Sequence, residues 1–448
     1  MKRFLFVVGL LFITFTLFAH PGIEPVFTLD EVVGKERASL QELELTADEI
    51  FRLSLLFSEC PLESETVKRC LQKFEKIKAE VSCPEFMSQA PEDRGRAVLK
   101  LLYRDYLTTY NFDQTRTDAA LETGVYNCVS SALLYMAAAR ASGLEVRGQR
   151  TTQHAFCSIY VPVQNSRELQ KIDVETTNPY GFNPGSKETI ENEANIKQYF
   201  VVPKKYYSNR QEVSDCNFAG LIAGNLCSTC IKKGDYERGV PLGATRYDVI
   251  RLENSRTAAD VRQEFDILTA NYVNLKPASA KAFSEVVEWF TTVIDRWGVT
   301  DFLQKNMDNA YNNLIILCLK ENNDSLVHQY EQKFKSYVTQ NQLTKTEQLY
   351  KETVWLNQLN DYMNKREYQA GLQKADEALK ELPANQKIKN MRLYFYNNCI
   401  AVIHNNFAKE ANAGHFETAL KLLTEGLEAF PEDKTLKRDL ADLKKVMQ

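Results

Sequence analysis

Residues 124–143 are GVYNCVSSALLYMAAARASG, a turn followed by a helix of small and apolar residues that begins next to a cysteine. Gly124 allows a tight turn before the helix, and Gly143 stands where a left-handed residue commonly ends one. Because the backbone N–H groups of a first helical turn are unpaired, they stabilise a thiolate placed there. The stretch therefore predicts a reactive Cys128 at the start of a helix that packs closely beneath a sheet.

Three segments after this helix have the residue pattern of strands, at residues 145–150, 154–163 and 169–175. A run of turn residues follows at 178–185. One helix followed by an antiparallel sheet predicts an α+β core over residues 121–205.

The core contains one histidine, His154, which begins the second predicted strand. A cysteine nucleophile needs a base within reach, and an acid can hold the imidazole in its working tautomer. Asp173 lies on the next predicted strand and is the expected acid, and Glu175 shares its face as the alternative. We therefore predict Cys128 as nucleophile, His154 as base and Asp173 as the residue that orients it. For an oxyanion, the backbone N–H of Cys128 is the first candidate donor and the Asn127 side chain the second.

These residues also resemble a known family. A cysteine at a helix start, His154-Ala155-Phe156 on a strand and Ile172-Asp173 on the next are similar to the transglutaminase-like superfamily, over about residues 94–190. The resemblance implies a papain-like fold that acts on amide or γ-carboxamide bonds with the same three residues. It requires no cofactor. A zinc site at Cys128, His154 and Cys157 is an alternative use of these ligand types, although no fourth ligand is evident.

Helical segments precede and follow the core. Residues 28–120 are a predicted helical lead-in, in which Thr46 has the character of a helix N-cap. Residues 216–448 are almost wholly helical, and Tyr368–Pro383 aligns with Phe416–Pro431 in its aromatic, small, leucine and proline positions. This pattern resembles tetratricopeptide repeats, which implies a C-terminal all-α domain that binds a protein or peptide partner.

The N-terminus has the order of a secretory signal: basic residues at Lys2 and Arg3, an apolar run over residues 4–18 and a small residue at Ala19. We expect residues 1–19 to be a signal peptide and the protein to be exported, either periplasmic or secreted. Membrane contact is expected only if this segment stays uncleaved.

Composition limits the classes of function. The net charge is −4, with 55 basic and 59 acidic residues and no dense basic stretch. That balance argues against nucleic-acid binding, which requires a basic face. The mean hydropathy of −0.37 is that of a soluble globular protein.

The 10 cysteines are spread along the chain, so disulfides are not needed in place of a core. If Cys128 is free, nine remain, and at least one of these is also unpaired or intermolecular. The Cys227–Cys230 pair has CxxC spacing in a helical context, which favours core packing or a local disulfide over redox catalysis.

Two functions follow from these expectations. The first is an exported cysteine-nucleophile hydrolase or acyltransferase acting on amide bonds, with repeats that bind a protein partner or the substrate. The alternative is a non-catalytic periplasmic scaffold in which the repeats bind the partner and the transglutaminase-like domain is degenerate.

Overall fold

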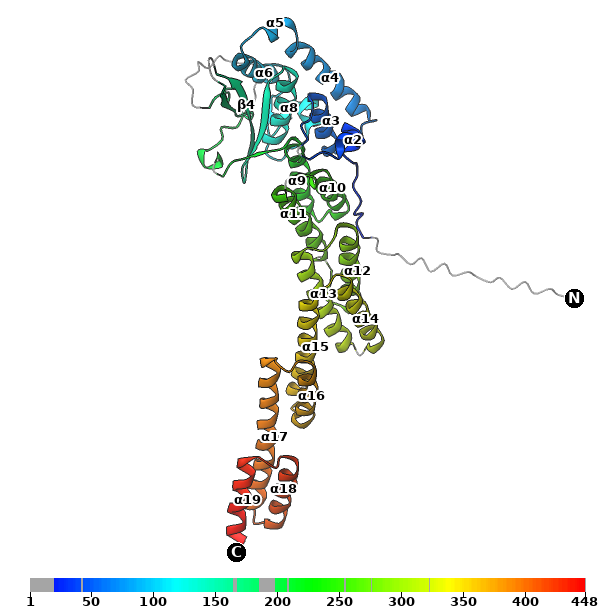
Figure 1. The fold of residues 1–448 in the computed structure, drawn as a ribbon, viewed down its shortest axis with the longest axis vertical. Coiled ribbons are helices and arrows are strands. Elements are labelled where there is room, and N and C mark those ends of the chain that lie inside the picture. Colours follow the sequence, from blue (N-terminus) through cyan, green and yellow to red (C-terminus); the bar gives the residue numbers. More distant parts are fainter. Residues whose placement is uncertain are drawn as a thin grey trace, which may run out of the picture. The chain divides into compact units, whose positions relative to one another are not determined.

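The chain folds into two compact units, Met1–Leu275 and Lys276–Gln448 (Figure 1). Most of the described residues are helical, and a small antiparallel sheet lies in the first unit. The predicted signal segment, residues 1–19, lies outside the described residues. The computed structural model describes residues 20–41, 43–163, 167–184, 198–207, 209–253, 255–274, 276–321 and 323–447.

The predicted helical lead-in is a series of helices that pack around the core of the first unit. Thr46 caps the third of them, because its side chain accepts from Glu49 N at 3.3 Å while the Glu49 carboxylate accepts from Thr46 N at 2.8 Å. This capping box confirms the helix start predicted at Thr46. The helices are α1 (Asp30–Val33), α2 (Lys35–Ala38), α3 (Ala47–Phe57), α4 (Glu65–Val81), α5 (Pro84–Met87), α6 (Pro91–Asp105) and α7 (Thr117–Thr123).

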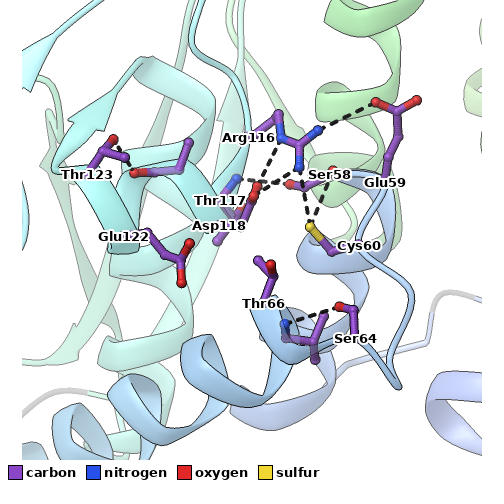
Figure 2. Close-up of polar contacts among 12 residues, drawn as sticks. Ser58, Glu59, Cys60, Ser64, Thr66, Arg116, Thr117, Asp118, Glu122 and Thr123 are labelled. Atoms are coloured by element: carbon purple, nitrogen blue, oxygen red, sulfur yellow. Dashed lines mark hydrogen bonds and ion pairs between the residues drawn. The ribbon is translucent and has the colours of Figure 1, made fainter.

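The turn after α3 is bonded to the start of α7, as Figure 2 shows. Ser58 Oγ accepts a hydrogen bond from Thr117 N at 2.9 Å. The Arg116 guanidinium donates to both carboxylate oxygens of Asp118, at 3.1 and 2.9 Å, and lies 3.4 Å from Cys60 Sγ. Burial, with a contribution from Asp118, raises the pKa of Cys60 to about 12. This thiol therefore stays protonated and belongs to the packing.

Helix α8 (Cys128–Ala141) is the central helix of the first unit. Its residues from Val129 to Ala139 are all buried, which fits a helix of small and apolar side chains with no polar face. Asn127 caps the beginning, and Gly143 lies just past the end with a φ of 74°. The helix predicted from the sequence is therefore confirmed at both ends.

The four-stranded sheet has the order β5-β4-β3-β6, and all its pairs are antiparallel. One face of the sheet lies against α8, where Cys157 Sγ of β4 is 3.3 Å from Ala132 O of the helix. A short parallel pair, β1 with β2, leads into α8. The predicted helix followed by an antiparallel sheet is thus present. The strands are β1 (Thr109–Tyr110), β2 (Val125–Tyr126), β3 (Glu145–Arg150), β4 (Ala155–Pro162), β5 (Leu169–Val174) and β6 (Gln211–Val213), with a 3-10 turn at Lys204–Tyr207.

Three helices that follow β6 also belong to the first unit: α9 (Asp215–Lys233), α10 (Tyr236–Ile250) and α11 (Ser255–Val273). Helix α9 packs on β3 so closely that a Cβ added at Gly148 would lie 2.4 Å from the Phe218 ring. At its beginning, the buried Asp215 carboxylate pairs with Arg140 of α8 and accepts from Leu45 N at 2.9 Å.

The boundary between the compact units therefore differs from the boundary predicted near residue 216. We expected α9–α11 to belong to the repeats because residues 216–448 are almost wholly helical in their sequence pattern. Packing against β3 and the buried pairing of Asp215 join these helices to the α+β core instead.

The second unit is all-helical over its described residues, and each helix packs on its neighbours in the chain. Ser279 caps the first helix by accepting from Ala282 N at 3.2 Å. Among the described residues of both units, no helix combines the length and apolar character needed to cross a membrane. The helices of this unit are α12 (Ala280–Trp297), α13 (Asp301–Lys320), α14 (Asp324–Gln340), α15 (Thr344–Lys365), α16 (Tyr368–Glu381), α17 (Gln386–Asn412), α18 (Phe416–Ala429) and α19 (Lys434–Met447).

The two aligned sequence segments form equivalent helices, α16 and α18. Gly371 of α16 meets the Phe395 ring of α17, where an added Cβ would lie 2.4 Å away, and the aligned Ala419 of α18 is fully buried. A small residue thus allows close helix packing at the same place in both segments. Helix α17 connects them: Phe395 belongs to the apolar cluster around α16, and Ile400 belongs to the cluster around α18.

Candidate active site

Cys128 is the first residue of α8, as the sequence predicts. Its position depends on β1 and β2, because Asn111 N donates to Tyr126 O at 2.8 Å just before the helix begins. A first-turn residue has a backbone N–H without a partner inside the helix. The Cys128 N–H is therefore available as a donor to an oxyanion, in the role expected from the sequence.

The side chain of Asn127, the second predicted oxyanion donor, caps α8. Its Oδ1 accepts from Val129 N at 2.9 Å and from Ser130 N at 3.2 Å, and its Nδ2 donates to Phe112 O at 3.2 Å. An asparagine before a first helical turn satisfies otherwise unpaired N–H groups. These bonds fix Asn127 at the helix start beside Cys128.

His154 lies immediately before β4 and is bonded to Glu175. Its Nε2 is 2.7 Å from Glu175 Oε2, and the side chains are only 2% and 4% exposed. With Nε2 bonded to the carboxylate, Nδ1 is the ring nitrogen left for Cys128, whose side chain interacts with the same imidazole. The structure thus brings together the predicted nucleophile and the predicted base.

The Glu175 carboxylate is saturated with donors. Its Oε1 accepts from Thr177 N at 3.1 Å and from Thr177 Oγ1 at 2.8 Å, while Oε2 also accepts from the Tyr207 hydroxyl at 2.8 Å. Burial and then the Glu175 charge raise the pKa of Tyr207, so its hydroxyl remains a donor. Donors on both oxygens fix the carboxylate in place, and the fixed carboxylate holds the imidazole in one orientation.

The electrostatics of the pair favour a charged imidazole. Burial lowers the pKa of His154, but the interactions with Cys128 and Glu175 outweigh burial and raise that pKa to about 10. An imidazolium at neutral pH is the partner that a thiolate requires. The site can therefore hold a thiolate–imidazolium pair beside a carboxylate.

Asp173, the acid predicted from the sequence, is not the one that the structure brings to His154. Its carboxylate accepts from Arg210 Nη1 at 2.7 Å, from Arg210 Nη2 at 2.8 Å and from Ser158 Oγ at 2.7 Å. Burial raises the pKa of Asp173, and the hydrogen bonds from Arg210 and Ser158 outweigh it and lower that pKa. Asp173 is a member of a polar network on the sheet, and the alternative acid, Glu175, bonds to His154.

The register of the sheet explains this correction. Asp173 of β5 lies opposite Ser158 of β4, and Ser158 is four residues after His154. Four residues of strand are about 13 Å. The alternation of the sequence puts Asp173 and Glu175 on one face, but it does not say which of them reaches the start of β4. Tyr207 has no sequence signal, because it comes from a 3-10 turn 32 residues after Glu175.

A cavity of about 930 Å³ lies beside Cys128 and His154. That volume is within the range of small-molecule and peptide sites. One wall comes from the segments around β1, the start of α8 and the β3–β4 turn, and the other comes from α9, α10 and α11. We did not predict the second wall from the sequence, because we expected α9–α11 to belong to the repeats. The residues of the second wall include Leu221, Gly224, Cys227, Gly243, Arg246, Glu264, Phe265 and Leu268.

The other uses proposed for cysteines have no support in the geometry of the described residues. Cys157 points to α8 at Ala132 O, on the opposite face of β4 from the bonded His154 ring, and no group of three or more metal-ligating side chains is found in the described ranges. Cys227 and Cys230 are both free and buried in α9. Burial raises the pKa of Cys227 to about 12, which fits a packing role.

No family model, curated protein or solved structure matches this chain.

Proposed function

We propose that the protein is a cysteine-nucleophile hydrolase or acyltransferase that acts on amide bonds. The observation that carries this proposal is the bond from His154 Nε2 to the buried Glu175 carboxylate, at 2.7 Å, in the same cavity that Cys128 lines from the first residue of α8. A nucleophile, a base and a residue that orients the base are the parts that such chemistry needs. Glu175 takes the role that the sequence analysis gives to Asp173.

The reaction begins with attack of the Cys128 thiolate on the amide carbonyl carbon. The oxyanion that forms accepts a hydrogen bond from the Cys128 backbone N–H. The C–N bond then breaks as the His154 imidazolium gives its Nδ1 proton to the leaving amine. The products of this half-reaction are a free amine, a neutral imidazole and an acyl-thioester on Cys128.

The second half-reaction restores the enzyme. Neutral His154 takes a proton from water, in a hydrolase, or from an amine, in an acyltransferase, as that nucleophile attacks the thioester carbonyl. The thiolate leaves and the imidazolium is regenerated. The Glu175 carboxylate orients the imidazole and stabilises its charged form in both steps.

The elements that carry these residues also support a proposal for the fold. A cysteine at the start of a central helix, a histidine at the start of a strand and an antiparallel sheet beside that helix support a papain-like, transglutaminase-like core. The paired helices of the second unit, with small residues at Gly371 and Ala419 in equivalent positions, support tetratricopeptide-like repeats that bind a protein or peptide partner. The export proposal rests on the sequence of residues 1–19 alone.

Selective alkylation tests the proposal. In wild-type protein, iodoacetamide should modify Cys128 well below pH 8, because the imidazolium and the helix start favour its thiolate. His154→Ala should abolish this low-pH reaction. His328→Ala, at an exposed position in the second unit, is the matched control and should leave the rate unchanged. Peptide mass spectrometry identifies the modified cysteine, and Cys83→Ser removes the other cysteine that is not fully buried.

The result also separates the two functions considered from the sequence. Rapid low-pH modification that depends on His154 supports the enzyme. If Cys128 reacts no faster than an ordinary thiol and His154→Ala changes nothing, the enzyme proposal fails and the non-catalytic scaffold takes its place.

A further inference from the structure

Two arginines in the cavity share one carboxylate. Arg150 Nη2 lies 3.1 Å from Glu264 Oε1, and Arg246 Nη1 is bonded to Glu264 Oε2. Arg150 comes from the end of β3, while Arg246 and Glu264 come from α10 and α11. Two guanidinium groups and one carboxylate have a net charge of +1. Apart from the Cys128–His154 pair, the other charged side chains that line the cavity are Asp113 and Lys232, which cancel each other, so the excess positive charge of the cluster remains.

Arg246 is the member of this cluster that is deeply buried and incompletely bonded. The residue is 4% exposed and lines the cavity, and its Nε has no hydrogen-bond partner. A buried unpaired N–H is costly, and a guanidinium is the side chain suited to a carboxylate. The guanidinium packs closely on α9, since a Cβ added at Gly224 would lie 2.9 Å from Arg246 Nη1. A buried guanidinium in the cavity wall favours an anion in the cavity.

The cluster is close to the reacting residues. Arg150 pairs with Ala155 across β3 and β4, and the next residue, Thr151, donates through its N–H to His154 O at 2.8 Å. Residues opposite each other in an antiparallel pair have Cα atoms about 4.5–5.5 Å apart. The positive charge and the reacting residues belong to one space, because Arg150 and Arg246 line the same cavity as Cys128 and His154.

We propose that Arg150 and Arg246 form a subsite for a carboxylate group of the substrate, a few atoms away from the amide bond that Cys128 attacks. This inference rests on the proposed function and names its substrate class: a peptide or amino-acid amide with an anionic group next to the reacting bond. The carboxylate is either a chain terminus or an acidic side chain, since both present the same two oxygens to a guanidinium.

Three matched alkylating reagents test the subsite at Cys128. N-bromoacetyl-alanine has a terminal carboxylate, the α-amide of N-bromoacetyl-aspartic acid has a side-chain carboxylate, and N-bromoacetyl-alaninamide is neutral. The measured quantity is the ratio of the rate constant of each anionic reagent to that of the neutral one, with Cys128 modification followed by mass spectrometry. In wild-type protein this ratio should exceed one at low salt and fall as ionic strength rises.

Three variants locate the effect. Arg150→Gln should lower the ratio about fivefold, because it removes one unit charge from a partly hydrated cleft. Glu264→Gln should raise the ratio, because it removes the shared carboxylate. Arg147→Gln is the matched control on the same strand: it pairs with Glu145, does not line the cavity and should leave the ratio unchanged.

The outcomes are separate from those of the proposed function. Slow reaction of Cys128 with the neutral reagent sinks the enzyme proposal, whereas the rate ratio reports on the subsite alone. A ratio that stays the same in Arg150→Gln overturns the subsite, even if Glu264→Gln does not fold. A larger ratio for the terminal or for the side-chain carboxylate identifies which source the subsite prefers.

Discussion

Both units of the chain contain a histidine bonded to a carboxylate, and the pair His154–Glu175 of the first unit differs in its surroundings from the pair His404–Asp439 of the second. His154 and Glu175 have side chains 2% and 4% exposed, whereas those of His404 and Asp439 are 40% and 7% exposed. Glu175 is also bonded to Thr177 and Tyr207. A histidine–carboxylate pair is therefore buried in one unit and partly hydrated in the other.

The difference matters because water screens charge. A buried pair interacts strongly, and removal of one partner leaves the other without compensation. A pair beside solvent contributes little, since water replaces the lost partner. The buried pair in the first unit has the properties expected of a functional site. The pair in the second unit has the properties of a partly exposed contact between α17 and α19.

The largest expected effect comes from removal of each acid. Glu175→Ala should lower the free energy of unfolding by about 3–5 kcal/mol, because His154, Thr177 and Tyr207 lose a common buried partner. Asp439→Ala should cost about 1 kcal/mol or less. Urea unfolding followed by circular dichroism measures both, and equal losses would contradict the contrast between the two pairs.

Close glycine contacts provide a second comparison. Gly148→Ala on β3 and Gly371→Ala on α16 each place a Cβ 2.4 Å from a buried ring, of Phe218 and Phe395. Forced overpacking costs about 1–3 kcal/mol. In a helix, alanine recovers about 0.5–1 kcal/mol relative to glycine. The loss in thermal stability should therefore be larger for Gly148→Ala, and a larger loss for Gly371→Ala would show that α17 is the less adaptable neighbour.

The pH dependence of stability tests the charge on His154. The folded pKa of about 10 is above the ordinary value of about 6.5, so the protonated ring stabilises the fold. This contribution is fully present below about pH 6.5 and is lost as pH rises through about 10. The difference in unfolding free energy between wild type and His154→Gln should shrink over that range. A constant difference would mean that the ring is neutral.

Cys128→Ala provides an independent measurement on the same ring. It removes one of the two interactions that raise the pKa of His154, so NMR titration of the imidazole should show a lower pKa than in wild type.

The smallest effect is expected at Asp173. Asp173→Asn weakens the pair with Arg210, whose side chain is 33% exposed, and should cost about 1 kcal/mol or less in stability. The rate of iodoacetamide modification of Cys128 should stay close to that of wild type, because this carboxylate does not bond to His154. A large fall in that rate would return Asp173 to the site in place of Glu175.

Much of the local structure follows from the sequence. The Thr46 cap, the start of α8 next to Cys128 and its end before Gly143 depend on hydrogen bonds and backbone conformations within a few residues, so the residue types predict them. Strands β3, β4 and β5 follow from patterns of the same short range, whereas β6 (Gln211–Val213) was not predicted. The assignment of α9–α11 could not be predicted in this way, since amphipathic helices have the same pattern whether they cover a sheet or stack in repeats.

The candidate site likewise has residues that the sequence predicts and residues that only the tertiary structure brings together. The sequence by itself predicted Cys128 as the candidate nucleophile and His154 as the candidate base, because Cys128 stands at a helix start and His154 is the one histidine of residues 121–205. Only the tertiary structure decided that Glu175 and not Asp173 bonds to that histidine, and that α9–α11 complete the cavity with Arg246. The physical reason is that strand register and helix packing are set by contacts between distant segments, and alternation along one strand is unchanged by a shift of two residues.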